Sequence, residues 1–238
     1  MEKEEKIVSM FNQIAPTYDR ANRAMSLGVD LAWRRSACKI VYKKTAQKEI
    51  SIADIACGTG DMMGVWQEMA AKFDKEIVSL VGVDPSSGML EVAKKKFPQF
   101  KFIEALADNT TLGSGIADIL SISYGIRNIP KRKESLREFN RVLKNGGHLV
   151  VLEFAKNDKK SFISKFREFY LKNIVPRVGA FISKNRAAYE YLPNSIDNFL
   201  DKDSFCDELK ECGFELELVK GYSFDISTLF LAKKVKNI

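Results

Sequence analysis

The stretch SIADIACGTGDMMG (residues 51–64) constrains the fold more than any other part of the chain. The apolar run ISIADIA is typical of a buried parallel strand, and a helical pattern over 62–73 follows it. Between them, Gly58 and Gly60 permit a tight turn and let a ligand approach the backbone closely. The stretch therefore predicts a strand, a glycine turn and a helix, with a ligand held at the carboxyl edge of an open α/β sheet.

Further strand-like runs and helical patterns alternate along the chain, which predicts a doubly wound parallel sheet. The runs cover 50–56, 77–84, 100–106, 116–124 and 148–154, with helical patterns at 62–73, 87–97 and 131–143. After a helix near 203–212, two runs at 214–223 and 228–234 lie too close together for a parallel crossover, so we expect an antiparallel hairpin. A mostly parallel seven-stranded sheet with such a hairpin is the Rossmann-like α/β fold of class I S-adenosylmethionine-dependent methyltransferases.

The 238 residues suit one domain rather than two independent ones. Helical pieces before residue 50, broken at Pro16 and Gly28, can cap the ligand edge of the sheet. We expect a single domain over 1–238, divided into an N-terminal helical cap (1–49), a cofactor-binding core (50–155), a basic amphipathic insertion on the substrate side (156–200) and a C-terminal helix and hairpin (201–238).

Composition favours a cytoplasmic protein without a metal. The N-terminus MEKEEKIVSM mixes acids and bases, and no run reaches the roughly 18 apolar residues of a membrane span. Four cysteines without a C-x-x-C pair and the single His148 are too few for a zinc site or a disulfide framework.

The net charge of +7 comes from residues 156–186, which hold nine Lys or Arg and two acids. Apolar residues about one helical turn apart alternate with these lysines, which predicts an amphipathic helix. Two interpretations stay open: a solvated basic face over an ordinary core, or a portal for an apolar ligand that also contacts anionic lipid. The apolar residues are Phe162, Ile163, Phe166, Phe169, Tyr170 and Ile174.

The glycine turn favours S-adenosylmethionine over a dinucleotide. The fingerprint G-x-G-x-x-G would place its third glycine at position 63, which is Met63. Asp61 at the start of the helix would also repel a pyrophosphate from the positive end of the helix dipole. S-adenosylmethionine has no phosphate and carries positive centres that tolerate a carboxylate. The alternative is a plain turn that ends in a capping Asp.

Asp84 ends the second strand-like run, 24 residues after Gly60. A carboxylate in this place can accept both ribose hydroxyls of a nucleoside, although an Asp-Pro turn with Ser86 or Ser87 capping the next helix is the alternative.

The end of the fourth strand-like run and the residues after it, LSISYGIRNI, lack the [ND]-P-P-[YFW] segment of amino-methylating enzymes. We therefore do not expect methylation of a base nitrogen.

Several segments together resemble the UbiE/MenG family, the C-methyltransferases of menaquinone and ubiquinone biosynthesis. They are MFNQIAPTYDRANRAMSLGVDLAWRR, DIACGTGD, SISYGIRNI, RVLKNGGHLVVLEF and VPRVGAFISKNRAAYEYLPNSIDNF, and they span nearly the whole chain in order. The segment at 106–112, LADNTTL, departs from the family pattern [DN]-A-E-A-L-P-F. The resemblance implies that S-adenosyl-L-methionine binds at Asp54, Gly58, Thr59, Gly60, Asp84, Leu106, Ala107, Asp108 and Ser123.

The acceptor that the resemblance implies is demethylmenaquinol, methylated in the last step of menaquinone synthesis. A ring carbon becomes nucleophilic when the neighbouring phenol loses its proton, so a base or a hydrogen-bond donor that favours the phenolate is needed. We expect Arg127, Asn128, Tyr18 and Asp19 to serve this chemistry. Arg127 as a surface ion pair, Asn128 as a helix cap, and Tyr18, Asp19 and Asn22 as ordinary packing are the alternatives.

Two further titratable residues are weaker candidates for the base. His148 begins the fifth strand-like run, far from the carboxyl edge, and is rejected. Glu153 lies at the correct end of the same run.

Other functions stay open at this stage. The acceptor could be the methoxy-polyprenyl-benzoquinol of ubiquinone synthesis or another small aromatic. A quinone carrier without turnover and an RNA-binding protein are remote alternatives, so we expect a lipid quinol as partner and no nucleic acid. Peripheral contact with the cytoplasmic face of the inner membrane and a homodimer are left as options.

Overall fold

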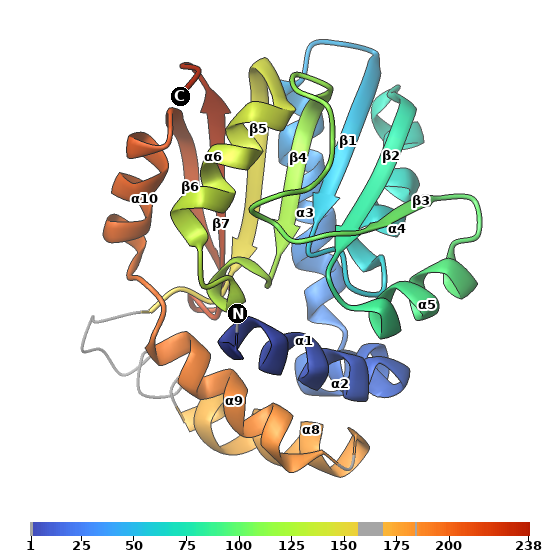
Figure 1. The fold of residues 1–238 in the computed structure, drawn as a ribbon, viewed down its shortest axis with the longest axis vertical. Helices are drawn as coiled ribbons and strands as arrows, with labels where there is room; N and C mark the ends of the chain where they lie inside the picture. Colours follow the sequence, from blue (N-terminus) through green and yellow to red (C-terminus); the bar gives the residue numbers. More distant parts are fainter. Residues whose placement is uncertain (1, 157–168, 184) are drawn as a thin grey trace.

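A seven-stranded sheet forms the centre of the molecule in a computed structural model that describes residues 2–156, 169–183 and 185–238 (Figure 1). The strand order is β3-β2-β1-β4-β5-β7-β6, and every pair is parallel except those that involve β7. The strands are β1 (Glu49–Ile55), β2 (Glu76–Asp84), β3 (Lys101–Glu104), β4 (Ala117–Ser123), β5 (Leu143–Glu153), β6 (Phe214–Tyr222) and β7 (Ser227–Lys234).

The parallel sheet and the C-terminal antiparallel hairpin are confirmed. β7 inserts between β5 and β6, with Glu153 opposite Thr228 and Phe214 opposite Lys234. The strand order reverses at β1, which has β2 on one side and β4 on the other. In such sheets the crevice beyond the carboxyl ends of these central strands is where a ligand binds.

Helices cover both faces of the sheet. The helices α6 and α10 bury apolar side chains such as Phe139 and Phe205 on one face. On the other face, α3 and α4 bury Tyr42 and Trp66. The helices of these layers are α3 (Val29–Lys44), α4 (Asp61–Ala70), η2 (Ala71–Phe73), α5 (Ser87–Lys96), η3 (Ile126–Asn128), α6 (Arg132–Val142) and α10 (Lys202–Glu211).

A second group of helices lies across the carboxyl edge of the sheet, toward which the parallel strand arrows point in Figure 1. Pro16 interrupts the first helix in a short 3-10 turn, and Gly28, with φ +77° in the left-handed region, is the N-cap that precedes α3. The predicted breaks therefore fall where expected, and the chain can fold back over the edge. These elements are α1 (Glu2–Ile14), η1 (Ala15–Thr17), α2 (Tyr18–Ser26), η4 (Tyr170–Ile174), α8 (Val175–Ser183) and α9 (Arg186–Asp197).

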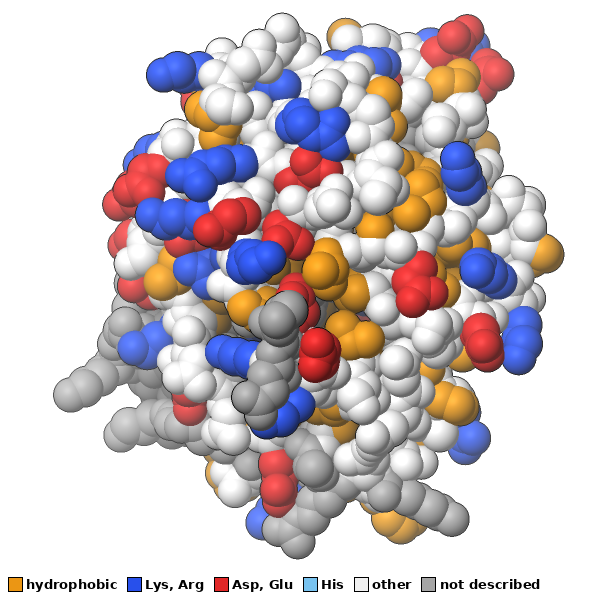
Figure 2. Space-filling model, in the orientation of Figure 1, with side chains coloured by type: hydrophobic (Ala, Val, Ile, Leu, Met, Phe, Trp, Pro, Cys, Tyr) orange, Lys and Arg blue, Asp and Glu red, His pale blue; other side chains and the backbone are white. Residues whose placement is uncertain are grey.

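The predicted amphipathic helix of 156–186 lies in part outside the described residues, and Phe162, Ile163 and Phe166 are among those not described. Its described part, η4 and α8, packs against α2 and α9. On the face seen in Figure 2, the basic side chains shown in blue lie among acidic ones. That face carries no extended surface of a single charge in its described part.

Candidate functional site

A cavity of about 770 Å³, including space open to solvent, lies at the carboxyl ends of β1, β2 and β4. We call it the sheet-edge cavity. Strand-end residues form its floor, and α1 contributes an apolar wall. Its lining includes Ile7, Phe11, Tyr18, Gly58, Asp84, Met89, Leu106, Ala107, Ser123, Tyr124, Asn128 and Ile129.

The glycine turn borders this cavity through Gly58 alone. Gly58 has φ +55°, and a Cβ placed on it would meet no atom within 4 Å, so the backbone is open to a ligand here. Gly60, with φ +83°, faces away, and its position for a Cβ lies 3.0 Å from the Phe97 ring. The two glycines thus serve different purposes: Gly58 exposes the backbone, and Gly60 lets α4 begin close against Phe97.

Asp84 is the ionisable group at the base of the cavity. Its carboxylate accepts hydrogen bonds from the backbone N–H of Gly58 and of Ser86, each at 2.8 Å. Burial raises the pKa of Asp84 to about 6, although these two N–H groups lower it in part. Both carboxylate oxygens keep lone pairs for further donors. Ser86 also caps α5 by accepting from Met89 N, which confirms the capping role of Ser86, while ribose binding by Asp84 stays a prediction.

Ser123 brings an unpaired polar atom to the end of β4 beside this cavity. Its Oγ is buried and has no hydrogen-bond partner among the described residues. Buried polar atoms are rarely left unpaired, because the loss of hydration is costly. With the Asp84 carboxylate, the open Gly58 backbone and the apolar walls at Leu106 and Ala107, the cavity fits a nucleoside with hydroxyl donors, as S-adenosylmethionine has.

Four residues assigned to the cofactor lie elsewhere. Asp54 is buried within β1 and accepts from Ser121 Oγ at 2.5 Å. Thr59 Oγ1 donates to Asp19 at 2.5 Å, and Gly60 packs against Phe97. The Asp108 carboxylate is ion-paired with Lys131 at 2.7 Å. None of the four borders the sheet-edge cavity, and their assignment to the cofactor stays a prediction.

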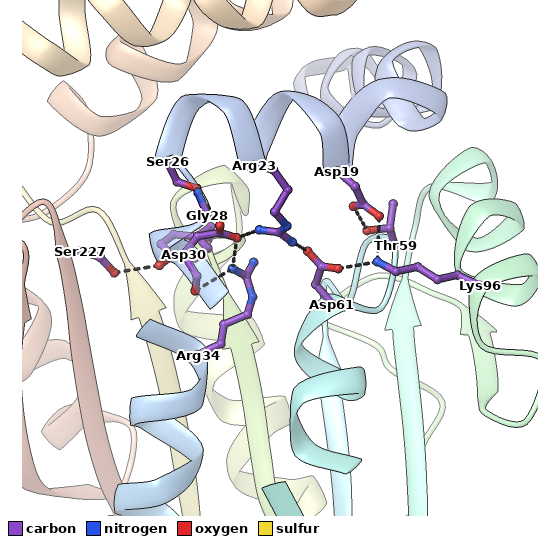
Figure 3. Close-up of polar contacts among 11 residues, drawn as sticks. Asp19, Arg23, Ser26, Gly28, Asp30, Arg34, Thr59, Asp61, Lys96 and Ser227 are labelled. Carbon is purple, nitrogen blue, oxygen red and sulfur yellow. Dashed lines mark hydrogen bonds and ion pairs between the residues drawn. The ribbon is translucent and has the colours of Figure 1, made fainter. Parts of the chain in front are cut away.

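Asp61, which served to argue against a pyrophosphate, has its charge neutralised within the protein. Figure 3 shows its carboxylate between Arg23 of α2 and Lys96 of α5. Arg23 also pairs with Asp30, and Lys96 also pairs with Asp19, so the charged side chains form a continuous row of ion pairs. Burial alone would raise the pKa of Asp61, but these neighbouring cations outweigh it and hold the pKa below its usual value. The acid therefore fastens the cap to the glycine turn.

A second cavity of about 860 Å³, including space open to solvent, lies between the cap helices and the sheet edge. We call it the cap cavity. Phe11, Tyr18 and Tyr124 line both cavities, so the two adjoin. Its remaining walls are mostly apolar and come from residues as far apart as Met10 and Ile226, with polar groups at Asn22, Asp30, Arg34 and Arg127.

Arg127 lies in the wall of the cap cavity, where buried partners fix its guanidinium. Nη1 is 2.6 Å from Glu153 Oε1 and 2.5 Å from the Tyr124 carbonyl oxygen, and Nε donates to Ser195 Oγ at 3.2 Å. Burial raises the pKa of the Glu153 carboxyl, and Arg127 lowers it in part. The pair is buried rather than on the surface. Glu153 is fully buried behind Arg127 and lines neither cavity, which places it as support for the arginine and away from an acceptor.

The other predicted catalytic residues divide between the two cavities and the cap. Asn128 borders the sheet-edge cavity and accepts from the Tyr191 hydroxyl at 3.2 Å; it does not cap α6, which begins at Arg132 after Lys131. Burial raises the pKa of the Tyr18 hydroxyl, so this group stays protonated near neutral pH. Asp19 faces Thr59 and Lys96 and lines neither cavity.

Sequence reasoning did not find Arg34 and Tyr124 as site residues. Tyr124 follows Ser123 directly and has φ +60°, a left-handed conformation that is uncommon for a residue with a side chain. Its hydroxyl lies 2.9 Å from Ser227 Oγ of β7. Arg34 follows Trp33 in the segment AWRR, and a basic residue beside an apolar stripe carries no local signal of burial.

Comparison with known proteins agrees with this geometry. The model of the ubiE/COQ5 methyltransferase family matches residues 1–234. The chain is 58% identical over 235 residues to a Campylobacter jejuni protein named ubiquinone/menaquinone biosynthesis C-methyltransferase UbiE, covering 99% of this chain and all of the relative. It is 33% identical over 229 residues to the demethylmenaquinone methyltransferase of Chlorobaculum tepidum, covering 96% and 92%.

Solved structures with the same fold are more distant in sequence. An S-adenosylmethionine-dependent methyltransferase of Thermotoga maritima has a TM-score of 0.63 and 20% identity, covering 97% of this chain and all of that one. Another from Aquifex aeolicus has a TM-score of 0.57 and 14% identity, covering 83% and 89%. These structures support the methyltransferase fold.

Proposed function

The chain belongs to the ubiE/COQ5 methyltransferase family, and we propose that it methylates a ring carbon of demethylmenaquinol. Its methyl donor is S-adenosylmethionine, the cofactor of the family. Relatives that cover nearly the whole chain are named for menaquinone or ubiquinone methylation, which supports a prenylated quinol as acceptor.

The observation that carries this proposal is the mostly apolar cap cavity beside the sheet-edge cavity. An aromatic quinol with an isoprenoid tail needs apolar walls and a few polar groups that fix its orientation. The cap cavity supplies both, with Arg127 in its wall and Tyr18 and Tyr124 at the boundary with the sheet-edge cavity.

Bound S-adenosylmethionine supplies an electrophilic methyl group, with Asp84, Ser123 and the Gly58 backbone as the residues that would hold it. Arg127 then has two tasks toward the acceptor. Its guanidinium donates hydrogen bonds to the hydroxyl beside the reacting carbon, and its positive charge favours the phenolate. Because Glu153, Ser195 and the Tyr124 carbonyl oxygen fix it beforehand, it does not need to reorganise during the reaction.

Tyr18 and Asn128 support this arrangement without removing a proton. The phenol proton, and the ring C–H proton that the methyl group replaces, would pass to water, since both cavities include space open to solvent. Tyr18 is a hydrogen-bond donor at neutral pH, since burial raises the pKa of its hydroxyl. Asn128 lies where the two cavities approach, with its amide oxygen engaged by Tyr191. Together they help to align the acceptor, and alignment supplies a large part of the rate enhancement in such transfers.

A second acceptor, the methoxy-polyprenyl-benzoquinol of ubiquinone synthesis, is favoured by one observation. The 58% identical Campylobacter jejuni protein carries both quinones in its name. Naphthoquinol and benzoquinol are both flat diols with a prenyl tail, so the cap cavity supports either.

We propose in addition that the outer surface of the cap contacts lipid. The exposed apolar residues are Leu27 directly after α2, Phe169 directly before η4, Ile174 of η4 and Phe181 of α8. Leu27 and Phe181 are each 87% exposed. Arg177 of α8 is exposed as well and would add attraction to anionic headgroups. Within the described ranges, no helix is long and apolar enough to cross a bilayer. The alternative partner for this surface is a second copy of the chain, which light scattering would detect.

The test is methyl transfer from labelled S-adenosylmethionine to demethylmenaquinol with a short isoprenoid tail, with the oxidised quinone as control and the benzoquinol as a parallel acceptor. We expect label on a ring carbon from the naphthoquinol and none from the quinone. Label only from the benzoquinol would assign the second acceptor. Absence of label from every quinol, with cofactor binding shown by calorimetry, would overturn the proposal.

A further inference from the structure

We propose that Arg34, a residue of the cap, binds the acceptor hydroxyl that lies across the ring from the one served by Arg127. The two oxygens of the diol would then be divided between a cation of the cap and a cation of the sheet edge. This inference rests on the proposed function and assigns a positioning residue to the same site.

Arg34 is buried in α3, with 6% of its surface exposed, and lines the cap cavity. Within the described part of the chain, its hydrogen bonds all use Nη1, which donates to Asp30 Oδ2 at 2.9 Å and to the Asp30 carbonyl oxygen at 3.4 Å. Nε is buried and has no partner among the described residues. A guanidinium has five N–H donors, so Arg34 is an under-used cation beside an apolar cavity.

Arg34 shares its ion-pair partner with other donors. Asp30, its carboxylate partner, also accepts from Arg23 and from Ser26 Oγ (Figure 3). Arg127, by contrast, has the Glu153 carboxylate to itself among the cations of the described ion pairs. A buried arginine whose partner carboxylate is shared has capacity for another acceptor atom, and a quinol oxygen supplies one.

Aromatic contacts place the two arginines at one site. The Arg34 guanidinium lies over the Tyr124 ring, 5.1 Å from its centre. The Tyr124 ring stacks on Phe154 with ring centres 4.6 Å apart, and the Arg127 guanidinium lies 5.4 Å from the centre of Phe154. Each arginine therefore covers one ring of the same stacked pair. All four residues line the cap cavity.

This arrangement matches the chemistry of a flat diol. Its oxygens lie at opposite ends of the ring, and the reaction requires that one of them become the phenolate beside the nucleophilic carbon. Two separate cationic donors in the wall of one cavity would fix which carbon faces the methyl donor. Binding of the distal hydroxyl by Arg34 thus orients the ring, while Arg127 assists the phenolate.

The test compares two acceptors across two proteins. The first acceptor is the demethylmenaquinol diol; the second keeps the hydroxyl beside the methylated carbon and lacks the one across the ring. For the wild type, we expect kcat/KM to fall about 10- to 100-fold when the distal hydroxyl is removed. Arg34→Met should lose a similar factor on the diol and lose little more on the monohydroxy acceptor. Arg34→Lys keeps the charge toward Asp30 and covers the case in which Arg34→Met does not fold.

Arg35→Met, beside Arg34 but in an exposed ion pair with Glu68, is the matched control and should behave as the wild type. S-adenosylmethionine affinity should not change in the Arg34 variants. If the Arg34 variants lose the same factor on both acceptors, or if the wild type treats both acceptors alike, the assignment is overturned. If the wild type methylates neither acceptor, it is the proposed function that fails.

Discussion

The sheet-edge cavity and the cap cavity adjoin, yet different interactions fix the residues that form them. Backbone N–H groups hold the Asp84 carboxylate, and strand ends in parallel register set the positions around it. The cap is held by side-chain ion pairs, among them Arg23 with Asp61 and with Asp30. Backbone geometry changes little with salt, whereas partly exposed ion pairs weaken in it. The comparison predicts a rigid cofactor side and a cap that opens more easily.

Replacement of the central acid on the sheet side should give the largest effect. Asp84→Ala removes the carboxylate that lines the sheet-edge cavity at the end of β2, and it leaves two backbone N–H groups without their acceptor. We expect S-adenosylmethionine binding by calorimetry to weaken at least about 100-fold, since a lost charged acceptor costs several kcal/mol. Glu104→Gln, at the end of neighbouring β3, is the control. Unchanged binding in Asp84→Ala would remove this residue from the site.

Arg127→Met should lower turnover without weakening the binding of S-adenosylmethionine, which would show that the two cavities have separate roles. The variant loses a fixed donor to the acceptor, so turnover should fall about 10²- to 10³-fold. Affinity for S-adenosylmethionine should stay near that of the wild type, because Arg127 lines the cap cavity and not the sheet-edge cavity. Arg127→Lys keeps the charge but not the two-sided contact with Glu153 and Ser195, and should recover part of the rate. Equal loss of binding and turnover would contradict separate roles for the cavities.

The same contrast explains how much the sequence could predict. The strand, glycine turn and Asp84 lie within 36 residues, and their patterns are local, so the sheet edge was predictable. Thr59 and Gly60 belong to the same motif but face the cap and Phe97, because a turn points its residues in several directions. Local spacing locates a turn and does not say which of its side chains face the ligand.

The cap cavity could not be assembled from local patterns. Its residues range from Met10 to Ile226, and Tyr124 is positioned by Ser227, 103 residues later. Arg34 gave no local signal, because only tertiary packing buries it. Arg127 was predicted from its place after the fourth strand, at the edge where the acceptor must lie, and the structure adds its ion pair with the buried Glu153.

The pH dependence of cofactor binding should report on the sheet side alone. Burial raises the pKa of Asp84 to about 6 in the free protein. On our assignment, ribose hydroxyls would donate to the ionised carboxylate. Affinity should therefore be constant above about pH 7 and fall as the pH drops below 6, by up to about tenfold per pH unit. Calorimetry between pH 5 and 8 would measure this.

Asp54 provides the control for that titration. Burial raises its pKa to about 7, but it binds Ser121 inside β1 and lines neither cavity. Asp54→Asn should keep the same fall in affinity below pH 6. A profile that becomes flat in Asp54→Asn would show that the wrong carboxyl had been assigned.

Removal of the cap's ion pairs should have a smaller effect that depends on salt. Arg23→Gln breaks the contacts with Asp30 and Asp61, in which the arginine side chain is 27% exposed. We expect a loss of about 1–2 kcal/mol in the free energy of unfolding, seen as a Tm lower by roughly 2–8 °C. Arg35→Gln, in an exposed pair with Glu68, should change the Tm by less than about 2 °C. If both variants lower the Tm equally, the cap is not held by these ion pairs.

Phe181→Ser tests the outermost part of the cap and should have the smallest effect. Phe181 is 87% exposed on α8, so its removal costs the fold little, while a phenyl ring buried in lipid contributes roughly 1.5–3 kcal/mol. A ring that inserts only partly into the lipid would contribute only part of this free energy. We therefore expect the variant to bind anionic vesicles a few-fold more weakly, as measured by co-sedimentation. Val78→Ser, 54% exposed on β2, is the control. Since the change lies outside both cavities, turnover with a short-tailed quinol should not change, whereas turnover of a long-tailed quinol in vesicles should fall with binding. A fall in both assays would mean that Phe181 stabilises the cap cavity itself, and the lipid surface would have to be sought elsewhere.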